Sequence, residues 1–131
     1  MTPAPDRSTQ QRLDALEQAN LVRTYRAQLK RDLYAARVDA DEVLVSGDPF
    51  LETMKAWDLL LAVPGLGRVK LDKWFRRNDI SPSKTIGGLS PRQRGRLVVL
   101  LRSYRATSNT YRRRREEAVV RFERLDEEVA A

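Results

Sequence analysis

The spacing of apolar side chains along the chain predicts an all-helical protein. Apolar residues recur every three or four positions, as expected for helices that bury one face. No segment alternates apolar and polar residues as a half-buried strand would. We expect helices over about residues 9–37, 40–46, 51–62, 68–78, 91–105 and 110–129.

Local signals place several helix ends. Asp39 is a good N-cap for the short second helix, and Pro64 stops the third because proline cannot continue helical hydrogen bonding. Ser90 followed by Pro91 is a strong start signal for the fifth helix. Residues 1–7 are expected to form a loose tail, and Ser8 or Thr9 is expected to cap the first helix.

The pattern divides the chain into three parts. Residues 1–20 are the tail and the start of the first helix, residues 21–104 form the helical domain, and residues 105–131 are a charged helical extension. The extension carries an apolar stripe, which indicates self-association or docking on the first helix rather than a solvated tail. The stripe consists of Tyr111, Ala118, Phe122, Leu125 and Val129.

The basic charge is concentrated in the middle of the chain. The 131 residues have a net charge of +7. Residues 1–63 carry 8 basic and 10 acidic side chains, residues 64–104 carry 10 and 2, and residues 105–131 carry 7 and 6. Essentially all of the excess therefore lies in 41 residues. Such a localised patch favours a polyanionic partner.

Composition excludes several kinds of chemistry. The chain has neither cysteine nor histidine, which removes disulfides, thiol chemistry, imidazole catalysis and the usual zinc ligands. We therefore expect no metal and no cofactor. No apolar run approaches the roughly 18 residues of a membrane helix, and the N-terminus lacks the apolar stretch of a signal peptide. The expected location is the cytoplasm, without membrane contact.

The turn Pro64-Gly65-Leu66-Gly67 opens the basic segment and predicts an anion site. Both glycines permit positive φ and close approach of a phosphate, and Leu66 can turn inward. The following helix then offers unpaired N–H groups and the positive end of its dipole. Val69, Trp74 and Phe75 are its expected apolar contacts. The same turn could instead be purely structural, but five basic residues follow it: Arg68, Lys70, Lys73, Arg76 and Arg77.

Other residues have both a binding and a structural interpretation. Trp57, Trp74 and Phe75 could stack on bases, although core packing is the favoured interpretation. Lys30 and Arg31 either contact a second stretch of phosphates or belong to a solvated face. The run Arg112–Arg115, followed by Glu116 and Glu117, is expected to pair within one helix.

A series of motifs in order resembles the actinobacterial-type integration host factors over roughly residues 22–103. The motifs are Leu29-Lys30-Arg31, Val63-Pro64-Gly65-Leu66-Gly67-Arg68 and Ile86-Gly87-Gly88-Leu89. The resemblance implies a long N-terminal helix packed on a helix–two-turn–helix domain at about 50–104, which is related to a ribosomal-protein domain. The extra amphipathic helix of residues 105–131 lies beyond the family's usual end.

The resemblance also implies a function and its residues. That family binds duplex DNA with little sequence preference, bends or compacts it in the nucleoid, and assists phage integrases in site-specific recombination. Carried over by position, its phosphate-binding turn is Pro64–Gly67, followed by Arg68, Lys70 and Lys73. The second contact region is the loop at Ser83 and Lys84, where this chain has fewer arginines than the family. Arg92 and Arg94 in the next helix are expected to compensate.

Three other functions stay open at this point. An RNA- or ribosome-associated protein could use the same turn on RNA phosphates, and this is the main alternative. A repair glycosylase or nuclease would need an acid or nucleophile beside the turn, but only Asp72 and Asp79 are available, so we expect no enzyme. A protein–protein adaptor would use the two charged helical arms as its interface.

Overall fold

The computed structural model describes residues 7–130, apart from the side chains of Arg7, Phe122 and Ala130. The all-α prediction is confirmed, since the described residues contain helices and a single isolated bridge between Lys55 and Thr85. The elements in chain order are α1 (Arg7–Tyr34), α2 (Ala40–Val45), the 3₁₀ helix η1 (Pro49–Leu51), α3 (Ala56–Leu61), α4 (Arg68–Arg77), α5 (Pro91–Thr107) and α6 (Asn109–Ala130).

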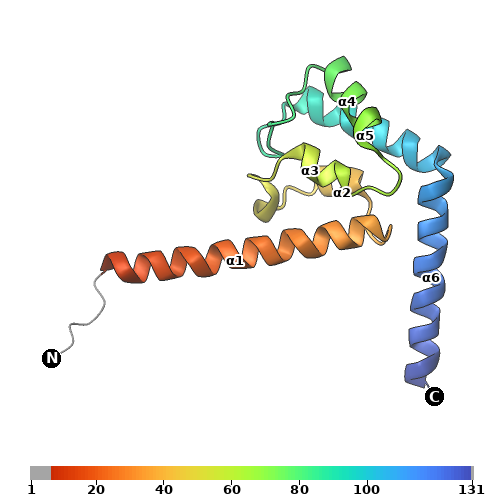
Figure 1. Ribbon diagram of the computed structural model, residues 1–131, viewed down its shortest axis with the longest axis horizontal. Helices are drawn as coiled ribbons and strands as arrows, with labels where there is room; N and C mark the ends of the chain where they lie inside the picture. Colours follow the sequence, from red (N-terminus) through yellow and green to blue (C-terminus); the bar gives the residue numbers. More distant parts are fainter. Residues whose placement is uncertain (1–6, 131) are drawn as a thin grey trace.

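The short helices α2 and α3 lie between α1 on one side and α4 with α5 on the other (Figure 1). The core they enclose begins at Leu29 in α1 and ends at Tyr111 in α6. Its most buried large side chains come from every helix of the central body, and they include Leu33, Leu44, Leu59, Leu60, Leu71, Phe75 and Leu97. Of α1, therefore, only the C-terminal half contributes side chains to the core.

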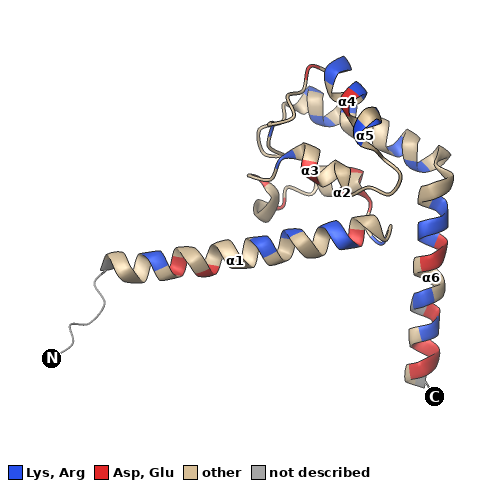
Figure 2. Cartoon of the chain, in the orientation of Figure 1, with Lys and Arg blue, Asp and Glu red and all other residues tan. Residues whose placement is uncertain are grey.

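Two long helices project from this body. In α1, Leu13, Leu16 and Leu21 are 48%, 60% and 60% exposed, so the N-terminal part of the helix does not pack against the core. The other arm, α6, projects from the body in a different direction from α1, with basic residues at its start and acidic residues at its far end (Figures 1 and 2). Each arm is the exposed part of a helix whose other end is buried in the body.

The ends of α1 differ from the prediction. Arg7 is already helical, so neither Ser8 nor Thr9 is the N-cap. Of the predicted tail, residues 1–6 lie outside the described part of the chain. The helix ends at Tyr34 rather than near residue 37, because Ala36 adopts a positive φ of 57° that breaks the helical path.

The predicted helix over 51–62 begins too early. Residues 52–55 instead pair with the loop before α5: Ile86 N–H donates to the Met54 carbonyl at 2.8 Å, and Ala56 N–H donates to the Lys84 carbonyl at 3.0 Å. These long-range hydrogen bonds take the place of the first helical turn, so α3 begins only at Ala56. The start of α5 is as predicted. Ser90 and Gln93 form a reciprocal capping box, and Pro91 is the first helical residue.

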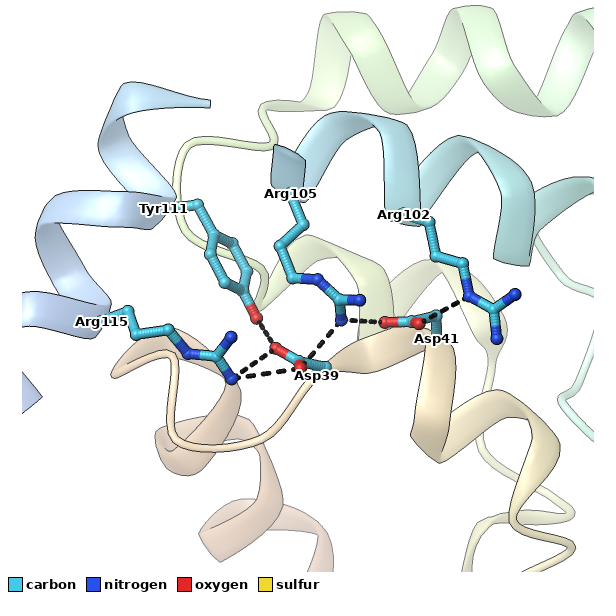
Figure 3. A network of polar contacts seen from close by, with 6 residues as sticks. All are labelled: Asp39, Asp41, Arg102, Arg105, Tyr111 and Arg115. Atoms are coloured by element: carbon cyan, nitrogen blue, oxygen red, sulfur yellow. Dashed lines mark hydrogen bonds and ion pairs between the residues drawn. The ribbon is translucent and has the colours of Figure 1, made fainter. Parts of the chain in front are cut away.

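A network of charges around two buried carboxylates fixes α6 to the body (Figure 3). Asp39 is the N-cap residue of α2, as predicted, but its side chain makes no cap hydrogen bond. Its carboxylate accepts a hydrogen bond from the Tyr111 hydroxyl and pairs with Arg105 at 2.8 Å and with Arg115 at 3.1 Å. Because Tyr111 and Arg115 belong to α6, the first turns of that helix are held against the start of α2.

Asp41, in the first turn of α2, completes the network. It pairs with Arg105 at 2.6 Å and with Arg102 at 3.1 Å, both from α5. Burial opposes the charge of Arg105, but the carboxylates of Asp39 and Asp41 outweigh it and raise the pKa of the guanidinium. Burial, together with the hydrogen bond to Asp39, raises the pKa of Tyr111 well above its usual range. The tyrosine therefore stays protonated as a donor.

Candidate nucleic-acid interface

The turn before α4 adopts the conformation expected at its first glycine. Gly65 has a φ of +77°, in the left-handed region that glycine tolerates. Leu66 is 2% exposed, so it points into the core as predicted, and its N–H donates to the Val63 carbonyl at 3.2 Å. Pro64 is also buried. The turn is therefore anchored at Pro64 and Leu66, while Gly65 and Gly67 lie at the surface.

Gly67 differs from the prediction. Its φ is −78°, so it needs no left-handed conformation, and it is the N-cap of α4. A Cβ at this position would meet no atom within 4 Å. The surface above Gly67 is thus open, and the first helical N–H groups of α4 lie beside it. The first helical hydrogen bond is donated by Leu71 to the Gly67 carbonyl, and the N–H groups before it have no partner within the helix.

Gly65 is required for a different reason than phosphate access. A Cβ there would lie 2.6 Å from the Tyr104 hydroxyl oxygen and 3.0 Å from Cβ of Thr110. Tyr104 ends the buried face of α5, and Thr110 lies in the first turn of α6. The missing side chain therefore lets the turn pack against the junction of α5 and α6, and the open approach lies over Gly67 instead.

The exposed face of α4 carries the basic side chains. Lys70, Lys73 and Arg77 follow one another at intervals of three and four residues, which places them on one face, and all three are exposed. We call these three residues the α4 basic face. Arg68 is also exposed at the start of the helix. Arg76 is exposed as well, but it pairs with Asp72 at 3.1 Å.

The buried face of α4 corrects one predicted contact. Val69 is predicted to pack inward, but it is 74% exposed. Leu71 and Phe75 are the buried residues of this helix instead. Val69 thus lies on the outer surface, in the first turn after the open position at Gly67. The next residue, Lys70, has its Nζ 4.9 Å from the centre of the Tyr104 ring.

A polar groove of about 380 Å³ lies between the end of α4 and the start of α5. Arg77, Arg92 and Arg96 line it together with Asp79. None of these three arginines takes part in the ion pairs of residues 7–130. The groove thus extends the α4 basic face onto α5. Arg96 was not predicted, although its position four residues after Arg92 on the same helix was the available signal.

Arg94 does not belong to this surface. Its guanidinium is partly buried and donates to the Leu44 and Ile86 carbonyls, the latter at 2.7 Å. It therefore joins α5 to α2 and to the loop before α5. The prediction that Arg94 compensates for missing loop arginines is not supported, because both terminal nitrogens are used inside the fold.

The remaining predicted contacts lie apart from one another. Ser83 is exposed, its hydroxyl 2.9 Å from that of Ser81, and Lys84 is half-buried in the same loop. Lys30 and Arg31 are exposed on α1, which lies across α2 and α3 from α4 (Figures 1 and 2). The structure therefore brings together the turn, the α4 basic face and Arg92, while Lys30 and Arg31 form a separate basic patch.

The large aromatic side chains serve the core. Trp57 packs edge-on against Phe75, with ring centres 5.2 Å apart, and Trp74 packs edge-on against Tyr104 at 6.1 Å. Phe75 is 1% exposed, and both tryptophans are half-buried against the core. The structural interpretation of these residues is therefore confirmed.

The described residues offer little for metal chemistry or membrane insertion. Between residues 7 and 130, no three His, Cys, Asp or Glu side chains gather as metal ligands would. Within the same part of the chain, no helix has the length and apolar character needed to cross a membrane.

Comparison with known proteins identifies the fold family. Residues 33–100 match the model of the S13-like H2TH domain. Integration host factors from Mycolicibacterium smegmatis and Mycobacterium tuberculosis are each 35% identical over 96 residues, which cover 72% of this chain and 91% of theirs. The chain belongs to the integration host factor family.

Two further proteins agree with that assignment. The integration host factor of Streptomyces coelicolor is 33% identical over 91 residues, covering 68% of this chain and 85% of its own. A solved structure described as sIHF bound to an 8-bp palindromic DNA is 29% identical, with a TM-score of 0.60. It matches 65% of this chain and 98% of its own. The helix–two-turn–helix expectation is thereby confirmed.

The match to the S13-like H2TH model ends before the last helix. The S13-like H2TH model stops at residue 100, within α5, whereas α6 begins at Asn109. About a third of this chain has no counterpart in the DNA-bound structure. The junction of Tyr104 and Thr110 against Gly65 thus joins the family's turn to a helix outside the matched domain.

Proposed function

We propose that this integration host factor-family protein binds duplex DNA through its backbone phosphates, with little preference for sequence. The open N-terminus of α4 at Gly67, beside the exposed Lys70 and Lys73, carries this proposal. Backbone N–H groups and a helix dipole favour an anion at such a position. Lysine and arginine contacts to phosphates hold the nucleic acid but do not read its bases.

Two further observations support duplex DNA as the partner. The segment of residues 64–104 carries 10 basic and 2 acidic side chains, which is a strong local field for a polyanion. A structural neighbour of the same family is described as bound to an 8-bp DNA. The proposed contacts are the backbone of Gly65 and Gly67, in the turn that the buried Pro64 and Leu66 anchor, and the side chains of Arg68, Lys70, Lys73, Arg76, Arg77, Ser83, Lys84 and Arg92.

The proposed role is architectural. Lys30 and Arg31 are exposed on α1, which lies across α2 and α3 from α4 (Figure 1), so one duplex that touches both patches must bend. Smooth bending of a short site costs on the order of 1–6 kcal/mol, which the second set of contacts would offset. Such bending or compaction would support site-specific recombination, with a phage integrase as a protein partner. We infer a non-enzymatic protein that acts on the nucleoid in the cytoplasm.

The experiment that tests the partner is a competition at one salt concentration. A labelled duplex of mixed sequence is bound to the protein and displaced either by unlabelled duplex or by a structured RNA hairpin of equal length. We expect the duplex to displace the probe at lower concentration. Tighter binding of the hairpin would contradict the proposal and favour an RNA- or ribosome-associated role.

A further inference from the structure

The outer part of α6 carries an apolar face that the body does not cover. Tyr111 is 4% exposed where the helix meets the body, and Ala118 is half-buried. Further out, Leu125 is 55% exposed and Val129 is 87% exposed. Positions 118, 125 and 129 are separated by seven and four residues, so they lie on one face of the helix, as in the seam of a coiled coil.

A basic groove opens at the inner end of this apolar face. It has a volume of about 300 Å³ and lies between the C-terminal end of α1 and α6. Ala118 and Leu125 contribute apolar surface, whereas Arg37, Arg114 and Arg121 supply three positive charges against one negative charge from Glu117. Arg121 takes part in none of the ion pairs of residues 7–130.

The opposite end of α6 has the complementary character. Val129 is preceded by Asp126, Glu127 and Glu128. The last turn of the helix has no basic residue and the first turn has no acidic residue. This arrangement opposes the helix dipole, which favours cations at the C-terminus. A positive surface brought to the acidic end would remove that penalty, and the groove at Ala118 is such a surface.

We propose that a second copy of this chain docks antiparallel along α6. In this pairing Val129 of each copy packs on Ala118 of the other, and each acidic end enters the basic groove of its partner. Glu128 of one copy then lies beside Arg121 of the other. The arrangement is isologous, because the same two contacts occur twice about a two-fold axis, and it closes at a dimer.

The dimensions fit a weak dimer. The overlap runs from residue 118 to residue 129, which is about 18 Å of helix at 1.5 Å per residue. The body holds only the first turns of α6, so the overlapping segment is the part that projects (Figure 1). A single pair of short helices buries less surface than a standard interface, so the dimer should be weak and should dissociate at low protein concentration.

The consequence for function is a connection between two DNA-binding bodies. Antiparallel pairing of the two α6 helices places one H2TH domain at each end of the dimer. Each domain keeps its own α4 basic face, so the dimer could join two duplexes. This consequence rests on the proposed DNA binding, whereas the dimer itself does not.

Sedimentation velocity of the full chain without DNA tests the dimer. Leu125→Glu places a charge in the paired face and should weaken dimerisation at least about tenfold. Val120→Glu is the matched control, because Val120 is 49% exposed and lies on the opposite face of the same helix. It should leave the dimer constant unchanged. Circular dichroism checks that both variants remain helical. A wild-type monomer at all concentrations, or equal weakening in both variants, would overturn the proposal.

A charge exchange tests the pairing partner. Arg121→Glu should weaken the dimer because it opposes Glu128 of the partner subunit, and adding Glu128→Arg in the same chain should restore it. Since the chain has no cysteine, Arg121→Cys and Glu128→Cys single variants can also be mixed and oxidised. The mixed disulfide should exceed both self-disulfides. Predominant Arg121→Cys self-linkage would instead indicate parallel pairing and contradict the antiparallel arrangement.

Bridging of two duplexes is then measured separately. Co-precipitation of a labelled duplex on an immobilised duplex should require wild-type α6 and fail with Leu125→Glu. If Leu125→Glu still binds a single duplex but no longer bridges, both proposals stand. If wild type dimerises but binds no DNA, the DNA-binding proposal fails while the dimer remains.

Discussion

The hydroxyl of Tyr104 donates a hydrogen bond to the Pro64 carbonyl at 2.7 Å. The two residues are 40 positions apart, so the C-terminal part of α5 directly holds the turn that begins α4. The same tyrosine ring lies under Nζ of Lys70 and against Trp74. One side chain therefore supports both the turn and the start of the α4 basic face.

Removal of that hydroxyl should loosen the turn. Tyr104→Phe keeps the ring contacts but leaves the buried Pro64 carbonyl without its donor, which costs about 1–3 kcal/mol of unfolding free energy. Urea denaturation measures this decrease. Tyr34→Phe is the control, because Tyr34 is 53% exposed, and its effect should be small. Equal effects of the two substitutions would show that the Pro64 contact is not special.

The two glycines of the turn should respond oppositely to serine. Gly65→Ser forces a side chain into a φ of +77° and against Tyr104, and should destabilise the protein by about 1–3 kcal/mol. Gly67→Ser adds an N-cap hydroxyl in open space and should be neutral or stabilising by up to about 1 kcal/mol. Thermal unfolding of both variants distinguishes the two glycines. Destabilisation by both substitutions would contradict the geometry of Gly67.

The carboxylate of Asp39 should be a major support of α6. Asp39→Asn removes the charge opposite Arg105 and Arg115, and should lower the unfolding free energy by roughly 2–4 kcal/mol. The loss is smaller than for a fully buried ion pair because Arg115 is half exposed. Asp32→Asn removes the more exposed pair with Arg37 and should cost less than about 1 kcal/mol. Urea titrations monitored by circular dichroism compare them.

Tyr111 predicts a dependence of stability on alkaline pH. Its pKa is raised in the folded protein above the ordinary value of 10.0, by burial and by the hydrogen bond to Asp39. Above pH 10 the unfolded chain releases the phenolic proton while the folded chain retains it, so the unfolding free energy falls by about 1.4 kcal/mol per pH unit. Tyr111→Phe should show a smaller fall over the same range. Parallel curves for the two proteins would contradict this role.

Local chemistry made the start of α5 and the turn at Gly65 predictable. The capping box of Ser90 and Gln93 and the positive φ of Gly65 depend on residues within a few positions of each other. The helical spacing of leucines likewise placed the core helices, and motif order placed the chain in its family. These features need no knowledge of distant contacts.

Distant contacts account for the features that the sequence did not predict. The side chain of Asp39 was expected to cap α2, but Tyr111, 72 positions later, takes its carboxylate. Arg114 and Arg115 were expected to pair with acids within their own helix. Arg114 does pair with Glu117 of its own helix at 3.9 Å and also packs on the Tyr34 ring, whereas Arg115 binds Asp39 instead. In α4, the packing of the surrounding helices determines which face is buried, so Leu71 lies in the core and Val69 is exposed.

The most direct test of DNA binding through α4 is the salt dependence of duplex binding, measured by fluorescence anisotropy. Lys73→Gln with Arg77→Gln removes two charges from the α4 basic face, and Arg12→Gln with Arg23→Gln removes two exposed charges from α1. Both variants fall from +7 to +5, since each loses two positive charges.

The wild type should lose affinity steeply as salt rises. The α4 variant should bind more weakly, with a slope reduced by roughly 0.9 for each phosphate that is no longer neutralised. The α1 variant should keep the wild-type slope. Equal slopes for the wild type and the α4 variant would contradict the claim that this face holds the DNA backbone.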